Sequence, residues 1–324
     1  MIDRLIEKID KTKNPTVVGL DPTYEMIPEK IKNEKLEQYG KTPKAVAEMF
    51  VSFNKVLIDS LYDIVPAIKP QIAMYEKYGV DGISAYIKTN SYAKEKGMVV
   101  IGDIKRGDIS STAEAYAAHL AGTEIEGERF DIWNTDAVTL NPYMGFDAIE
   151  PFIKPCNEYD KGMFVLVKTS NPSGVDLQGA EVSAIFGTLK EKLSVLFSNP
   201  SSLYEVTARL VDKWGKLAMG QNGYSKIGAV VGATNWHSGY SDDAARKMLR
   251  ELMPNTFFLV PGYGAQGGKA EDIRDFFDKD GRGVIVNSSR GIIAAYKSDD
   301  KYCDDDFGEA ARDAATAMKT ALTF

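Results

Sequence analysis

The sequence predicts an α/β protein with a (β/α)8 TIM barrel fold, and three observations lead to this class. Eight continuous apolar runs alternate with amphipathic segments, which is the pattern of a parallel sheet buried on both faces. Several runs end in a charged residue, as expected where barrel strands open into a site. The first run ends in Gly-Leu-Asp21-Pro, and no G-x-G-x-x-G motif opens the next helix, which disfavours a doubly wound open sheet.

Each element is assigned from its periodicity. In the helix over residues 46–61, for example, Val46, Met49, Phe50 and Phe53 begin a stripe with a spacing of three and four. An extra helix over 2–12 precedes the first strand, and polar insertions follow strands one and five, at 22–43 and 171–200. The remaining expected helices cover 79–96, 111–120, 146–153, 202–219, 241–252, 271–278 and 307–322, and the expected strands cover 16–21, 64–71, 98–105, 136–142, 162–170, 226–234, 257–262 and 283–290.

Length and composition narrow the class of protein. The 324 residues, 44% of them hydrophobic, fit either one barrel with insertions or two domains, and the element pattern favours a single domain over 1–324. A net charge of −7 offers no basic surface to nucleic acid. The first residues lack the apolar centre of a signal peptide, and no run approaches the roughly 18 apolar residues of a membrane span. We therefore expect a soluble, cytoplasmic protein with neither nucleic acid nor membrane as a partner.

Few side chains remain to carry chemistry. Cys156 and Cys303 lie far apart without metal-ligand spacing and are expected to be reduced thiols. His119 and His237 are the only histidines, so no histidine-rich metal site is expected. Lysine and carboxylate side chains must carry any reaction.

The most informative stretch is MVVIGDIKRGDISSTAEAY, residues 98–116. A buried strand ends here in Asp103 and Lys105, and Asp108 follows before a helix that is expected to begin at Ser111 or Thr112. Because side chains alternate along a strand, Asp103 and Lys105 project from the same face and favour each other's ionised form. An isolated pattern of this kind is more often a structural ion pair that closes a strand.

Charged residues at the ends of neighbouring strands favour an active site over a structural ion pair. Asp21 ends the first strand and Lys69 the second, so two acids and two lysines from three adjacent strands meet at the mouth of the barrel, where such enzymes place their active sites. A structural network of ion pairs remains an alternative for Asp21 and Lys69. The fifth strand adds Lys168, Thr169 and Ser170.

A phosphate site is expected after strands seven and eight. The glycine-rich run 261–268 (PGYGAQGG) follows strand seven, where barrels commonly bind phosphate through backbone N–H groups. Arg290, after Ser288 and Ser289, can grip the same anion with two hydrogen bonds. The glycines alone would equally suit a flexible turn, but the two features together indicate a phosphorylated substrate.

With these motifs in view, the chain resembles the orotidine 5′-phosphate decarboxylase family, and in particular its long-chain, bacterial-type branch. GLDP, AIKPQ, DIKRGDISST, VKTSNPSG, VVGAT, PGYGAQGG and NSSRG occur in the family's order over nearly the whole chain. The pattern D-x-K-x-x-D-I-x-x-T is specific to the family and its close relatives. The resemblance implies decarboxylation of orotidine 5′-phosphate to uridine 5′-phosphate without a metal or other cofactor, the last step of pyrimidine biosynthesis, in a homodimer with shared active sites.

The resemblance also assigns roles to individual residues. Lys105, Asp103, Asp108 and Lys69 would form the catalytic charge array, with Lys105 as the proton donor to C6 of the pyrimidine. The other implied contacts are Asp21 and Lys69 with the ribose, Ser170 with the pyrimidine, Gln266 and Arg290 with the phosphate beside a loop that includes Gly262, Tyr263, Gly264 and Ser289, and Asp108, Ile109 and Thr112 with the neighbouring subunit's site.

Two other reactions fit part of the pattern. A sister decarboxylase of the same superfamily acts on a keto-sugar phosphate with Mg²⁺, but a lysine at position 69 near Asp103 would repel that cation. A Schiff-base aldolase could use Lys69, Lys105 or Lys168, although a lysine between two aspartates is held in its charged form.

Overall fold

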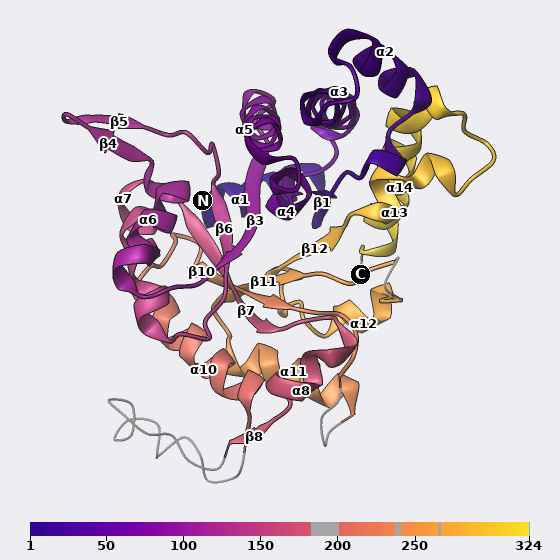
Figure 1. Ribbon diagram of the computed structural model, residues 1–324. Coiled ribbons are helices and arrows are strands. Elements are labelled where there is room, and N and C mark those ends of the chain that lie inside the picture. Colours follow the sequence, from indigo (N-terminus) through magenta and orange to yellow (C-terminus); the bar gives the residue numbers. More distant parts are fainter. Residues whose placement is uncertain (183–200, 237–240, 265–266, 324) are drawn as a thin grey trace.

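The computed structural model describes residues 1–182, 201–236, 241–264 and 267–323, and its centre is a closed barrel of eight parallel strands (Figure 1). All eight strands lie where the sequence predicts them, which confirms the fold class. In barrel order they are β1 (Thr16–Leu20), β12 (Val284–Ser288), β11 (Thr256–Val260), β10 (Ser225–Val231), β7 (Gly162–Lys168), β6 (Ala137–Leu140), β3 (Val99–Arg106) and β2 (Ala67–Pro70).

Helices surround the barrel, and the longer ones follow the predicted ranges closely (Figure 1). Capping side chains fix two of their starts: Thr42 accepts a hydrogen bond from the Ala45 N–H, and Ser241 accepts one from the Ala244 N–H. The helices are α1 (Ile2–Thr12), α2 (Glu29–Tyr39), α3 (Pro43–Leu61), α4 (Ile72–Glu76), α5 (Gly79–Glu95), α6 (Ser110–Ala121), α7 (Glu150–Glu158), α8 (Val175–Gln178), α10 (Leu203–Gly215), α11 (Asp242–Leu252), α12 (Ala270–Arg274), α13 (Arg290–Ile293) and α14 (Phe307–Ala321).

The extra N-terminal helix α1 closes the amino-terminal end of the barrel. Its apolar face, with Ile2, Leu5 and Ile6, packs in one buried cluster with interior side chains such as Phe164 and Phe257. The chain's amino group also forms an ion pair with Asp160. With this end sealed by apolar packing, the opposite end is left for a site.

Inward-facing positions change character along the strands. Near the amino-terminal end the inward side chains are apolar, as in Ala67, Ile101 and Ala137, which belong to the interior cluster. Two residues further along the same strands, the inward positions hold Lys69, Asp103 and Thr139, which are all buried. The strand period of two therefore places polar side chains from neighbouring strands around one opening.

The structure adds detail that the sequence analysis lacked. The insertion after β1 contains α2, which packs beside α3, and the insertion after β7 contains α8 and the short strands β8 (Glu181–Val182) and β9 (Ser201–Ser202). A hairpin of β4 (Thr123–Ile125) and β5 (Glu128–Phe130) follows α6 and was not predicted. Helix α6 was expected to begin at Ser111 or Thr112, and it begins one or two residues earlier, at Ser110. Among the described residues, no helix is long and apolar enough to cross a membrane.

Candidate active site

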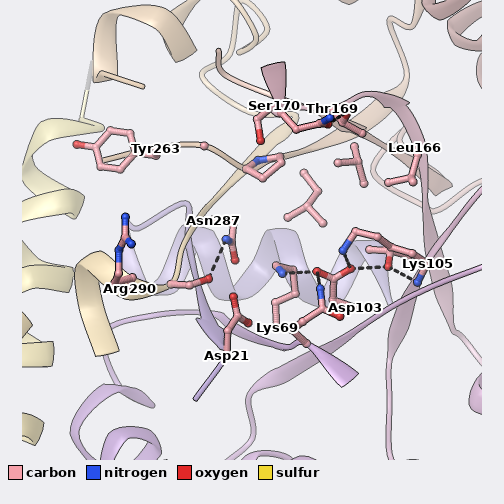
Figure 2. A pocket seen from close by; sticks show the side chains of 18 residues that line it. Asp21, Lys69, Asp103, Lys105, Leu166, Thr169, Ser170, Tyr263, Asn287 and Arg290 are labelled. Atoms are coloured by element: carbon pink, nitrogen blue, oxygen red, sulfur yellow. Dashed lines mark hydrogen bonds and ion pairs between the residues drawn. The ribbon is translucent and has the colours of Figure 1, made fainter. Parts of the chain in front are cut away.

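A cavity of about 560 Å³ lies at the carboxyl ends of the barrel strands (Figure 2). Residues from all eight barrel strands or the turns after them contribute to its wall. Among the described residues, the wall consists of Asp21, Lys69, Gln71, Asp103, Lys105, Thr139, Leu166, Thr169, Ser170, Asn171, Val230, Leu259, Pro261, Gly262, Tyr263, Asn287, Ser289 and Arg290.

The carboxylate of Asp103 is the most heavily hydrogen-bonded group in this cavity. Its Oδ2 accepts hydrogen bonds from Lys69 Nζ at 2.7 Å and from Gln71 Nε2 at 2.8 Å. Its Oδ1 accepts from Lys105 Nζ at 2.6 Å and from Thr139 Oγ1 at 2.7 Å. Figure 2 shows this network between three strands. The prediction that Asp103 and Lys105 are close neighbours is confirmed, and Lys69 joins them.

Electrostatics hold the two buried charged groups, Asp103 and Lys69, in their ionised forms. Burial alone would raise the pKa of Asp103, but the positive charges of Lys69 and Lys105 outweigh it and hold that pKa well below its ordinary value. Burial would lower the pKa of Lys69, yet the charges of Asp103 and Asp21 outweigh burial and raise it. The cavity therefore contains a fixed anion between two ammonium groups.

Lys105 differs from its partners in exposure and in backbone conformation. Its side chain is 44% exposed, whereas those of Lys69 and Asp103 are 7% and 6% exposed. Its φ of 46° lies in the left-handed region, which residues with a Cβ seldom adopt. The ammonium of Lys105 can thus reach a bound molecule while its hydrogen bond to Asp103 keeps it in place.

Polar groups line the side of the cavity near β1 and β12. One carboxylate oxygen of Asp21 is buried without a hydrogen-bond partner among the described residues, as is the side-chain oxygen of Asn287. Asn287 Nδ2 donates to Ser289 Oγ at 3.3 Å. Gly19 makes room for this pair, because a Cβ there would lie 1.9 Å from Ser289 Oγ.

The expected phosphate region lies on the same side of the cavity. Gly262, Tyr263, Ser289 and Arg290 all line the wall, and Gly264 is exposed beside them. Gly262 and Gly264 have φ angles of 101° and 71°, so a residue with a Cβ would be strained at either position. The Gly264 N–H donates to the Gly268 carbonyl at 2.9 Å, which closes the loop on itself. Gln266 lies outside the described residues.

Comparison with known proteins places this cavity in a family. The model of the orotidine 5′-phosphate decarboxylase / HUMPS family matches residues 17–302. The chain is 40% identical to an orotidine 5′-phosphate decarboxylase of Caldicellulosiruptor saccharolyticus over 321 residues, which are 99% of this chain and 97% of the relative. It is 41% identical to the enzyme of that name from Clostridium kluyveri over 313 residues, 96% and 93% of the two chains.

A solved structure agrees with the sequence matches. The structure of Leishmania donovani OMP decarboxylase superposes with a TM-score of 0.65 at 29% identity and covers 99% of both chains. The chain belongs to the orotidine 5′-phosphate decarboxylase / HUMPS family. It is accordingly an enzyme, a carboxy-lyase, and the resemblance drawn from the sequence motifs is confirmed.

Three residues of the family motif lie outside the cavity of this chain. Asp108, Ile109 and Thr112 are not among the residues that line it. Ile109 is 57% exposed, and Asp108 accepts a hydrogen bond from the Ile109 N–H at 2.8 Å on the rim. The single chain therefore brings Asp21, Lys69, Asp103 and Lys105 together in the cavity wall, and Asp108, Ile109 and Thr112 are not part of that wall.

Lys168 is buried next to the cavity rather than in it. Its Nζ donates to the carbonyl oxygens of Thr169 at 3.0 Å, Thr234 at 3.0 Å and Asn235 at 2.7 Å. Burial lowers the pKa of Lys168 to about 8. In this member of the decarboxylase family, Lys168 ties the turn after β7 to the turn after β10.

Sequence reasoning missed four polar residues of the cavity, namely Gln71, Thr139, Asn171 and Asn287. The signal was available for two of them: Thr139 lies two positions after the inward-facing Ala137, and Asn287 two positions after Ile285. Gln71 follows Pro70 at the end of β2, and its contact with Asp103 depends on how β2 and β3 meet. In a decarboxylase with few titratable groups, such neutral donors complete the site.

Proposed function

We propose that this protein decarboxylates orotidine 5′-phosphate to uridine 5′-phosphate without a cofactor, with Lys105 as the proton donor to C6. The observation that carries the proposal is the Asp103 carboxylate held between two ammonium groups, one of which, Lys105, is 44% exposed in a 560 Å³ cavity. A fixed, partly exposed ammonium is suited to stabilise and then protonate a developing carbanion.

The other wall residues suit the remaining parts of this substrate. The buried oxygen of Asp21 that lacks a partner among the described residues can accept from a ribose hydroxyl, and the Lys69 ammonium beside it can donate to one. We assign Ser170 to the pyrimidine. Arg290 and the loop containing Gly262, Tyr263, Gly264, Gln266 and Ser289 are assigned to the phosphate.

In the reaction, the bond between C6 and the carboxylate carbon breaks and its electron pair stays on C6. Carbon dioxide leaves, and Lys105 transfers a proton from Nζ to C6, after which solvent returns a proton to the amine. The hydrogen bond from Lys105 Nζ to Asp103 Oδ1 holds the ammonium in place before the transfer. Phosphate binding far from C6 can supply energy that aligns these groups.

We propose further that the active enzyme is a homodimer in which Asp108, Ile109 and Thr112 complete the neighbour's site. Their position on the rim, outside the cavity of their own chain, supports this assignment. Cytoplasmic residence also remains a prediction.

The Mg²⁺-dependent keto-sugar phosphate decarboxylation is disfavoured by the donor set. The Lys69 ammonium, 2.7 Å from Asp103 and close enough to Asp21 for that carboxylate to raise its pKa, would repel a divalent cation, and both oxygens of Asp103 already accept two hydrogen bonds each. A Schiff-base mechanism at Lys168 is disfavoured because its Nζ faces three carbonyl oxygens beside the cavity instead of lining it.

One assay separates these reactions. The purified protein is mixed with orotidine 5′-phosphate, with and without EDTA, and the loss of substrate absorbance is followed; a keto-sugar phosphate and trapping with borohydride serve as parallel arms. We expect turnover of orotidine 5′-phosphate that is unaffected by EDTA, and no trapped adduct. Turnover of the keto-sugar phosphate alone, abolished by EDTA, would replace the proposal with the sister activity.

A further inference from the structure

Strand β3 departs from regular pairing with β6 where it carries the charged residues. The register pairs Gly102 with Val138 and resumes at Arg106 with Leu140, so β3 advances from 102 to 106 while β6 advances only from 138 to 140. Lys105 lies within this bulge and has the left-handed φ of 46°. Such a conformation persists only when surrounding contacts hold it.

The hydroxyl of Thr139 supplies two of those contacts. It accepts a hydrogen bond from the Lys105 backbone N–H at 3.0 Å, and it donates to Asp103 Oδ1 at 2.7 Å. Thr139 is 1% exposed, so water does not replace it readily. A hydroxyl has one hydrogen, and because that hydrogen points to the carboxylate, a lone pair is left for the amide.

The same carboxylate oxygen also accepts from the Lys105 ammonium, at 2.6 Å. The Thr139 hydroxyl therefore links the backbone of Lys105 to the group that holds the end of its side chain. The backbone and, through Asp103, the ammonium end of Lys105 are thus both held in place by one atom, the hydroxyl oxygen of Thr139 in β6. A β-branched residue such as threonine is stiff at χ1, which makes that atom a firm reference point.

We infer that Thr139 is a positioning residue that directs the Lys105 ammonium toward C6 of the substrate. It sets the backbone conformation of Lys105 in the bulge and the orientation of the Asp103 carboxylate at the same time. The inference rests on the proposed decarboxylation and adds to it a residue outside the charged motif.

Valine at this position tests the inference because it keeps the shape of threonine and removes the hydroxyl. Thr139→Val should lower kcat by about 10- to 100-fold, the range expected when a reacting group is slightly misplaced. The KM for orotidine 5′-phosphate and the Kd for uridine 5′-phosphate should stay within about threefold of wild type, since the ribose and phosphate contacts are untouched. Thr139→Ser, which restores the hydroxyl, should recover most of kcat.

A matched control comes from β1. Thr16 is also buried in a barrel strand, but its hydroxyl has no hydrogen-bond partner among the described residues. Thr16→Val should leave kcat and KM unchanged. Thermal unfolding of all three variants separates a loss of folding from a loss of positioning.

The outcomes are distinct. Wild-type kcat in Thr139→Val would overturn the inference. A second overturning result is a fall in kcat with a matching rise in KM and a lower Tm that Thr139→Ser does not rescue. That result would mean that the hydroxyl of Thr139 is merely structural. If the wild-type protein itself fails to convert orotidine 5′-phosphate, the proposed function fails first and the inference fails with it.

Discussion

The ammonium nitrogen of Lys105 lies 2.6 Å from Oδ1 of Asp103, although the first side chain is 44% exposed and the second 6%. This contact joins an exposed part of the site to a buried one, and Asp103 is anchored by three further donors on its two oxygens. A long, flexible lysine gains a defined position from it without being buried. Charge in the cavity is thus arranged before any substrate arrives, and such preorganisation is a large source of rate enhancement in enzymes.

The first prediction concerns the stability that this charge array confers. Asp103→Asn should lower the free energy of unfolding at pH 7 by about 3 kcal/mol, because it leaves the buried ammonium of Lys69 without its counter-charge. The folded-state pKa of Asp103 is depressed, so its stabilisation is complete above the unfolded value of 3.8 and is lost as the pH falls through the folded value. Urea unfolding curves of variant and wild type should therefore converge in acid.

A matched control for that prediction is Asp108→Asn on the rim. This change should alter the free energy of unfolding by no more than about 0.5 kcal/mol, as is usual for surface substitutions. Equal losses in the two variants would show that the carboxylate of Asp103 is not specially stabilised.

The second prediction concerns His119, which is buried and stacked on Trp133 with ring centroids 3.9 Å apart. Burial and the positive charge of Arg106 lower its pKa to about 3, so the folded protein keeps it neutral. Stability from this residue is complete above pH 6.5, the ordinary histidine pKa, and falls as the pH drops toward 3.

His119→Phe keeps the stacked ring and removes the titration. Between pH 6 and pH 4.5, wild-type stability should fall more steeply than that of the variant, by up to about 1.4 kcal/mol per pH unit. Urea titrations at a series of pH values measure the difference. Parallel curves would mean that His119 is protonated in the folded protein.

The third prediction concerns the proposed contact between Arg290 and the substrate phosphate. Arg290→Ala should cost about 2 to 5 kcal/mol of transition-state stabilisation in kcat/KM, the range for removing one member of a buried charge pair. Added guanidinium should restore part of the activity by filling the vacated space. As a control, Arg282→Ala removes an arginine whose side chain is 45% exposed and paired with Asp10, and it should leave kcat/KM unchanged. A loss below about 0.5 kcal/mol with no rescue would place the phosphate elsewhere.

The fourth prediction tests the shared active site. Lys105→Ala and Asp108→Ala should each be severely impaired alone. If Asp108 serves the neighbour's site, mixing the two variants under conditions that exchange subunits makes about half of the dimers mixed, each with one intact and one doubly altered site. Activity should then approach roughly a quarter of the wild-type value. Exchange is confirmed with a tagged chain; once it is, an absence of recovered activity would show that Asp108 acts within its own subunit.

Much of this structure follows from patterns of apolar and polar residues. The barrel strands are continuous apolar runs, and the rule that side chains alternate along a strand predicts the contact between Asp103 and Lys105. The carboxyl-end rule for barrels then gathered Asp21, Lys69 and Arg290 into one cavity. These inferences depend only on local sequence and on the closure of the sheet.

Features that depend on the register between strands could not be predicted from the sequence. The bulge in β3 and the left-handed backbone of Lys105 have no local signal, since neither glycine nor asparagine marks the position. The β4–β5 hairpin turns through Glu126 and Gly127, with φ angles of 52° and 82°, in place of the Asn-Gly or Asp-Gly that announces such turns. The contact between Thr139 and Lys105 likewise exists only once β3 and β6 are aligned.

The most direct test of the central claim is single-turnover decarboxylation by Lys105→Ala, compared with wild type and with Lys154→Ala, in which the lost lysine is 75% exposed on α7. Orotidine 5′-phosphate absorbance is followed while binding of uridine 5′-phosphate is measured in parallel. We predict no detectable decarboxylation by Lys105→Ala, retained binding of uridine 5′-phosphate, and wild-type behaviour of Lys154→Ala. Turnover by Lys105→Ala within about tenfold of wild type would contradict the assignment of Lys105 as the proton donor.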